Sequence, residues 1–219
     1  MDALIAFAAA LLSFRLAGLL AARWRASRRP ELLAWSAGLA AYAVAAAAIA
    51  WGEAHGWDGR AFRIYYAAGG LLTAPLLGAG SLLLAGRRRA APVALVYAGL
   101  AVGISLVMPL QGVFAAHGIP DAQHHLAFLP ARLLAILANS LGTLAVVGVA
   151  LRSIRKRPLG NALIVAGIAA AAIGSGLAGL GAAGSAIGIA VGAALLYAGF
   201  VSPMRFPAAI RPHGAIKSP

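Results

Sequence analysis

The chain contains no cysteine and few charged residues. Without cysteine it can form no disulfide, no thiolate metal site and no cysteine-held iron–sulfur cluster. Charged residues make up 11% of the sequence, against roughly a quarter in an ordinary soluble domain. Only 5 residues are acidic, whereas 62% are hydrophobic. This composition indicates a membrane protein and leaves no soluble stretch for a kinase, nuclease or hydrolase domain.

Positive charge is gathered into four clusters with long apolar stretches between them. The clusters are Arg23, Arg25, Arg28 and Arg29; Arg87, Arg88 and Arg89; Arg152, Arg155, Lys156 and Arg157; and Arg205, Arg211 and Lys217. Each intervening stretch is long enough to cross a bilayer and return, because one span needs about 20 apolar residues. A net charge of +13 would suggest nucleic acid if the basic residues formed one patch. At the ends of apolar runs they indicate cytoplasmic loops instead, and no nucleic-acid partner.

Seven apolar runs are expected to form membrane-spanning helices, with no strand of consequence. They cover residues 3–22, 31–52, 61–86, 92–113, 126–151, 161–180 and 184–201. Basic clusters follow the first, third, fifth and seventh runs, so the positive-inside rule places the N-terminus outside and the C-terminus in the cytoplasm. The predicted fold is an all-α transmembrane bundle over residues 1–202, followed by a basic, proline-rich cytoplasmic tail over residues 203–219.

Small residues in the last two runs indicate close packing of helices. Gly184, Gly188 and Gly192 are spaced four residues apart, and Gly174 lies in the preceding run. In lipid, such residues let two backbones approach closely enough for dispersion contacts. Packing within one chain is the favoured interpretation. A homo-oligomer, or docking of another membrane-protein subunit on these helices, is the alternative.

Two prolines interrupt the third and fourth runs. Pro75 and Pro109 each remove a backbone donor, so we expect kinks whose freed carbonyls are satisfied by neighbouring helices or face a cavity. Polar residues also occur at mid-span, namely Thr73 in the third run and Asn139 and Thr143 in the fifth. We expect these side chains to make hydrogen bonds between helices, and the alternative is that they line a polar pathway.

Ionisable and aromatic residues gather in the two predicted outer loops, residues 53–60 and 114–125, and at the adjoining helix ends. If the loops meet, they form an outward-facing vestibule. Its candidate ligand-binding residues are Arg63, Arg132, Glu53, Tyr65, Tyr66, Asp121 and Gln111. Ionisable groups at membrane depth are costly and therefore suggest function. The alternative is that both arginines snorkel to lipid headgroups or form structural pairs.

Histidines in the second outer loop suggest a metal site. His117, His124 and His125 are the candidate ligands, together with the nearby carboxylate of Asp121, because imidazole and carboxylate suit Zn²⁺. Gly118 interrupts any helix there, so the spacing alone does not place these side chains on one face. The sequence identifies no cofactor, and the last run has no lysine that could form a retinal Schiff base.

Parts of the sequence resemble small uncharacterised bacterial membrane proteins with several spans. The resemblance is carried by RRPELLAW from Arg28, RIYY from Arg63 and LLGAGSLLL from Leu76. The stretch ARLLAILANSLGTLAVVGVAL, which begins at Ala131, is similar to the later half of those proteins. The resemblance implies a multi-pass protein of the bacterial cytoplasmic membrane, and it carries no activity over to this chain.

These patterns favour a non-enzymatic bundle that binds a small ligand from the extracytoplasmic side, as a transporter or sensor component. The main alternative is an accessory or structural subunit of a larger membrane complex. A third reading, an enzyme with an intramembrane metal or acid–base site, has no motif to support it. The expected partners are the lipid bilayer and, in the alternative reading, other subunits or a second copy.

Overall fold

The computed structural model describes residues 1–126, 128–155, 157–179 and 185–201, and this part of the chain is helical. The elements are α1 (Asp2–Ser27), α2 (Pro30–His55), α3 (Gly59–Tyr65), the π-helix η1 (Tyr66–Thr73), α4 (Ala74–Leu84), α5 (Ala90–Val107), α6 (Ala122–His125), α7 (Leu129–Arg152), α8 (Pro158–Gly179) and α9 (Ser185–Val201). Within these ranges, β pairing is limited to one isolated bridge between Leu110 and Leu126. The predicted all-α class is confirmed.

Six helical stretches in the described residues are long and apolar enough to cross a membrane. They are α1, α2, the continuous run α3–η1–α4, α5, α7 and the Pro158–Ser175 part of α8, with α9 as a shorter apolar helix. Large apolar side chains such as Leu11, Leu95 and Leu141 are exposed on the outside of the bundle. Such a surface suits lipid rather than water, as in a multi-pass membrane protein. The count of seven spans and their orientation stay predictions.

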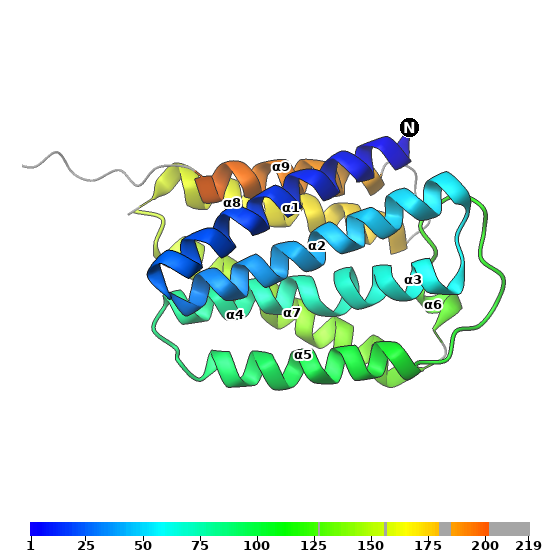
Figure 1. The fold of residues 1–219 in the computed structure, drawn as a ribbon, viewed down its shortest axis with the longest axis horizontal. Helices are drawn as coiled ribbons and strands as arrows, with labels where there is room; N and C mark the ends of the chain where they lie inside the picture. The colour runs from blue at the N-terminus through cyan, green and yellow to red at the C-terminus, as the bar shows by residue number, and fades with distance from the viewer. Residues whose placement is uncertain (127, 156, 180–184, 202–219) are drawn as a thin grey trace, which may run out of the picture.

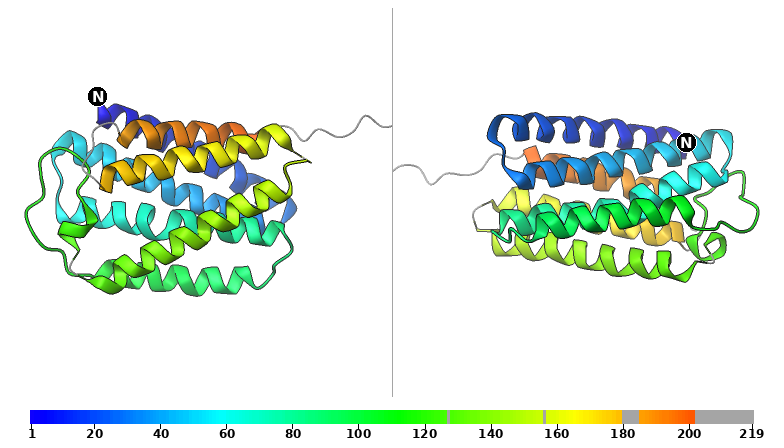
Figure 2. Two further views of the ribbon diagram at one scale, coloured as in Figure 1. Left: turned by 180° about the vertical axis from the view of Figure 1, so that it is seen from behind. Right: turned by 60° about the horizontal axis from the view of Figure 1, so that its bottom comes forward.

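Successive long helices run in opposite directions along the bundle (Figures 1 and 2). α1 packs on α2 and α9, α8 packs mainly on α9, and α4 packs between α2 and α7. α5 lies at the edge of the bundle against α4 and η1 (Figure 1). The connections after α1, α4 and α7 lie at one end and the N-terminus at the other, so three basic clusters share an end (Figure 1). The fourth cluster and the predicted tail, residues 203–219, lie outside the described residues.

The first helix boundaries follow local sequence signals. Arg28 adopts a left-handed conformation with φ of 54°, and its N–H bonds to the carbonyl of Trp24 at 2.7 Å, which ends α1. Pro30 then occupies the first position of α2, where a missing N–H costs nothing. The Asp58 carboxylate accepts a hydrogen bond from Ala61 N at 2.7 Å and caps the start of α3.

The fourth span is shorter than the sequence suggested. Residues 92–113 were expected to be helical, but α5 ends at Val107. Pro109 disfavours a helical conformation at Met108 and donates no hydrogen bond to the preceding turn. Pro109 therefore lies beyond the helix and does not kink it.

The glycines of α8 and α9 pack against each other within this chain. A Cβ added to Gly188 would lie 2.7 Å from Gly174 Cα, and one added to Gly192 would lie 2.9 Å from Gly167 O. Only glycine permits these distances, because real Cβ contacts are longer. Gly188 and Gly192 thus fulfil the expected role in intramolecular packing, whereas Gly184 lies outside the described residues.

Arg157 joins the two helices at the basic end of the bundle. Its guanidinium donates a hydrogen bond to Gly199 O of α9 at 3.1 Å. Burial, and then the charge of Arg23, lower the pKa of Arg157 below its usual value. Arginine still keeps its proton at neutral pH, so the bond to α9 is charge-assisted.

Candidate functional site

The two predicted outer loops meet in the structure. Glu53, at the end of α2, accepts hydrogen bonds from Trp57 Nε1 at 3.2 Å and from Gly118 N at 3.3 Å, so one carboxylate joins both loops. Phe114 stacks on His125 with ring centroids 4.3 Å apart. The loops meet, as the predicted vestibule requires, and the rings of Phe114 and His125 also lie against Phe62 of α3, with centroids 5.4 and 5.6 Å away.

Arg63 faces the bundle, and the described partners of its guanidinium are backbone carbonyls at the end of α5. Its guanidinium donates to Ser105 O at 2.6 Å, Met108 O at 2.9 Å and Leu106 O at 3.1 Å. In a continuing helix, Ser105 O would accept from the residue four positions later. That residue is Pro109, which has no N–H. Arg63 therefore supplies the missing donor and caps α5.

The remaining predicted ligand-binding residues are divided among separate local contacts. Tyr66 donates to Ala131 O at 3.2 Å, and Asp121 caps α6 by accepting from Gln123 N at 2.8 Å. Gln111 pairs through its backbone with His125. Arg132 makes no hydrogen bond or ion pair with the described residues. Tyr66 and Arg132 are close enough to interact electrostatically, but no described contact joins all seven side chains, and a ligand site formed by them stays a prediction.

The three histidines proposed as metal ligands also have separate surroundings. His124 Nδ1 lies 3.2 Å from an Asp121 carboxylate oxygen, whereas His125 Nδ1 lies 3.0 Å from Gln111 O. His117 lies in the exposed loop before α6. Across the described ranges, no three histidine, cysteine or carboxylate side chains group as metal ligands would. The metal-site hypothesis gains no support from this geometry.

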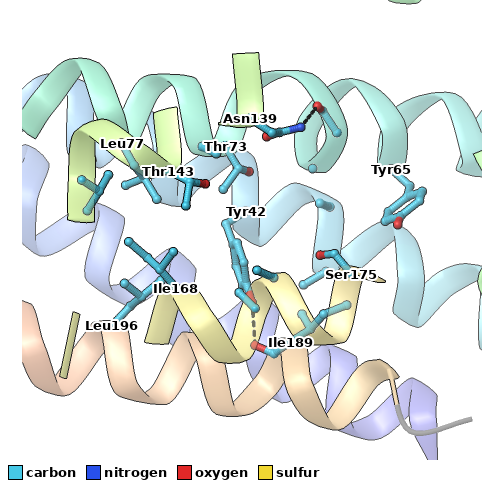
Figure 3. A pocket seen from close by; sticks show the side chains of 18 of the residues that line it. Tyr42, Tyr65, Thr73, Leu77, Asn139, Thr143, Ile168, Ser175, Ile189 and Leu196 are labelled. Atoms are coloured by element: carbon cyan, nitrogen blue, oxygen red, sulfur yellow. Dashed lines mark hydrogen bonds between the residues drawn. The ribbon is translucent and has the colours of Figure 1, made fainter. Parts of the chain in front are cut away.

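A cavity of about 280 Å³ lies inside the bundle, at a different place from the expected vestibule. Residues of α2, η1, α4, α7, α8 and α9 line it, and Tyr65 at the end of α3 extends it toward the outer loops (Figure 3). Its polar side chains are Tyr42, Tyr65, Thr73, Asn139, Thr143 and Ser175. Alanine, glycine, leucine, isoleucine and valine form most of the remaining wall. Tyr42, Thr73 and Asn139 are near the middle of their helical runs, so the cavity lies at mid-bundle depth.

The wall of this cavity includes a helical irregularity caused by Pro75. A proline at position 75 cannot donate to Leu71 O, four residues back, or to Gly70 O, five residues back. Neighbouring helices supply both donors: Tyr97 OH of α5 bonds to Leu71 O at 2.6 Å, and Asn139 Nδ2 of α7 bonds to Gly70 O at 2.6 Å. The chain is π-helical immediately before Pro75. The expectation that neighbours satisfy carbonyls freed by Pro75 is confirmed.

We expect Tyr97→Phe to lower stability by about 1 kcal/mol, because it leaves Leu71 O without a donor inside the membrane. Tyr197→Phe is the matched control, since the Tyr197 hydroxyl makes no hydrogen bond with the described residues. The measurement is thermal unfolding of detergent-solubilised protein, followed by tryptophan fluorescence. Equal melting temperatures for the two variants would contradict the assigned role of Tyr97.

Sequence reasoning found part of this cavity. Asn139 was expected to bond between helices, and it does, while Thr73 bonds within its own run to Ala68 O at 2.9 Å. Both also line the cavity, which was the alternative interpretation. Tyr42 was missed, although a lone tyrosine in the middle of an alanine-rich span was a usable signal. Its hydroxyl donates to Ile189 O of α9 at 2.6 Å.

The described wall residues include no carboxylate, histidine, lysine or arginine. The hydroxyl groups therefore have no neighbouring base to activate them, and the arrangement suits binding better than catalysis.

Comparisons with protein-family models, with curated proteins and with solved structures found no match.

Proposed function

We propose that this chain is a non-enzymatic membrane protein that binds a small ligand in the mid-bundle cavity, as a transport or sensory component. The observation that supports this most directly is the cavity itself, with six polar side chains around an otherwise apolar space. Its volume lies near the lower end of small-molecule pockets, which span roughly 300–1,000 Å³. Polar side chains at mid-span cost free energy in a membrane. Here they line a cavity and do not only bond to neighbouring helices.

The helical irregularity at Pro75 adds a second line of support. π-helical turns are frequent at functional sites, and this one contributes Gly69, Gly70 and Thr73 to the wall. The main alternative, an accessory or structural subunit of a larger membrane complex, would use the bundle mainly as a docking surface. It remains the alternative and is an outcome of the experiment that follows.

Filling the cavity should remove its ligand. Thr143→Phe places an aromatic ring in the cavity, whereas Leu144→Phe, on the exposed side of the same helix, leaves the cavity unchanged. Native mass spectrometry of each protein, extracted gently from its membrane, measures what is bound. We expect a small molecule with the wild type and with Leu144→Phe, and its loss from Thr143→Phe.

Equal small-molecule content in both phenylalanine variants would overturn the cavity as the site. A stoichiometric protein partner without any bound small molecule would favour the accessory-subunit alternative.

We also propose seven spans in the bacterial cytoplasmic membrane, with the N-terminus outside. The shared end of three basic clusters supports this orientation, and the resemblance to small bacterial membrane proteins supports the location. Because the chain has no cysteine, single thiols can report on it directly. We expect His117→Cys in intact cells to react with a membrane-impermeant maleimide, and Arg88→Cys to react only after the membrane is opened. Labelling of Arg88→Cys in intact cells would reverse the proposed orientation.

A further inference from the structure

The polar groups of the mid-bundle cavity present more acceptors than donors. Tyr42 and Thr73 each donate their hydroxyl proton to a backbone carbonyl, at 2.6 and 2.9 Å, so toward the cavity their oxygens can only accept. The Asn139 amide must direct Nδ2 toward Gly70 O, because two facing oxygens would repel each other. Its Oδ1 lies on the other side of the amide (Figure 3) and accepts no hydrogen bond from the described residues.

The remaining hydroxyls, of Tyr65, Thr143 and Ser175, make no hydrogen bond with the described residues and can donate or accept. A ligand with its own donor can therefore bond to any of the six polar groups. A ligand with only acceptors is restricted to three of them and leaves Asn139 Oδ1 without a partner. An unsatisfied polar group away from water costs free energy, so the wall favours a ligand that donates.

Charge is disfavoured in this cavity. None of the described wall residues is ionisable near neutral pH, so a charged ligand would lose its hydration without gaining an opposite charge. Most of the wall is aliphatic, which favours a ligand that already partitions into lipid.

α7 and α8 both contribute residues to the cavity wall. These helices come together near the turn that joins them and diverge toward the opposite end, and they pack on each other only sparsely (Figure 2). Ala172 and Ser175 of α8 line the cavity and are also exposed at the surface of the bundle. Their exposure and the sparse packing of α7 on α8 favour access to the cavity on this side.

We infer that the cavity takes an uncharged, mostly apolar molecule carrying a hydrogen-bond donor, such as a lipophilic alcohol, which enters sideways from the bilayer between α7 and α8. This inference rests on the proposed function and adds the chemical class of the ligand and its route. The donor of the ligand bonds to Asn139 Oδ1, and its apolar part contacts the aliphatic wall.

The test uses the full chain in lipid vesicles and an octanol carrying a photoreactive diazirine on its carbon chain. Mass spectrometry maps the labelled residues. Three competitors are compared at equal concentration in the membrane: 1-octanol, di-n-butyl ether and n-octylammonium. The first two are isomers, so only the hydroxyl proton and the shape of the chain distinguish them. We expect 1-octanol to compete about fivefold better than the ether, the change that one net hydrogen bond gives. Octylammonium should compete least.

The route is tested with two variants of α8. Ala172→Trp places a bulky ring at the inferred entrance between α7 and α8, whereas Ala169→Trp places the same ring on an exposed part of the helix that does not line the cavity. We expect labelling of the cavity to slow at least severalfold in Ala172→Trp and to stay at the wild-type rate in Ala169→Trp.

The outcomes separate this inference from the proposed function. Labelling with equal competition by octanol and the ether, or by octanol and octylammonium, would overturn the ligand class while the cavity remained a binding site. Equal labelling rates in the two tryptophan variants would overturn the lateral route. No labelling of any cavity residue would instead count against the proposed function itself.

Discussion

Gly142→Ala is expected to destabilise the protein by about 3 kcal/mol, because α4 and α7 are in backbone contact there. A Cβ on Gly142 would lie 2.7 Å from Pro75 N, and one on Gly78 would lie 2.6 Å from Gly142 Cα. Neither neighbour is the end of a flexible side chain, so the helices themselves would have to separate. Ala74, whose backbone lies against Gly142, also lines the cavity. Separation of the two helices would therefore disturb the cavity wall as well.

Gly148→Ala provides the matched control on the same helix. A Cβ at position 148 meets nothing within 4 Å, so alanine there should leave stability unchanged or raise it by up to about 1 kcal/mol through its better helix propensity. Thermal unfolding in detergent compares the two variants with the wild type. If both alanine variants melted together, the close crossing of α4 and α7 would be wrong.

Arg63→Ala is expected to cost about 3 kcal/mol as well. It removes the contacts of one guanidinium nitrogen, Nη1, with three carbonyls at the end of α5; the two N–H groups of Nη1 are shared among them, and a hydrogen bond from a charged donor contributes about 1.5–3 kcal/mol. The largest part of the loss comes from Ser105 O, because Pro109 offers no backbone donor in its place. Thermal unfolding of the detergent-solubilised variant measures this loss.

A second substitution tests the cause rather than only the size of this effect. In a Pro109→Ala background, the backbone gains an N–H that can bond to Ser105 O, so removal of Arg63 should cost clearly less than in the wild type. Arg60→Ala, an exposed arginine on the same helix, serves as the control and should change stability by less than about 0.5 kcal/mol. An undiminished cost in the Pro109→Ala background would show that Arg63 acts in some other way.

At two prolines of this molecule, a backbone carbonyl that lacks its helical donor is bonded by a side chain instead. Each proline removes a donor from an apolar helix, and a side chain from a neighbouring helix replaces it: Arg63 at Pro109, and Tyr97 with Asn139 at Pro75. Water cannot fill this role at membrane depth, so the protein must supply the donor. Arg63 was interpreted from sequence as a candidate ligand-binding residue, which stays a prediction; in the structure its guanidinium bonds to the carbonyls at the end of α5.

The sequence by itself determined the helical class, the apolar runs and the gathering of basic residues at the ends of those runs. These features depend on composition and spacing within a single run, because a helix satisfies its own backbone and lipid accepts its apolar side chains. The need for donors near Pro75 and Pro109 could also be predicted, since a missing N–H is a local property of proline.

Only the tertiary structure decided which groups meet those needs and where a cavity remains. Arg63 lies 42 positions from Ser105, and Asn139 lies 69 positions from Gly70, so each pairing depends on how separate helices are placed beside each other. The cavity is the space left between several helices after their side chains have packed, so it cannot be predicted from any single run. Association of helices in lipid depends on close surface fit rather than on a hydrophobic pattern, so spacing along the chain identified the spans but not the site between them.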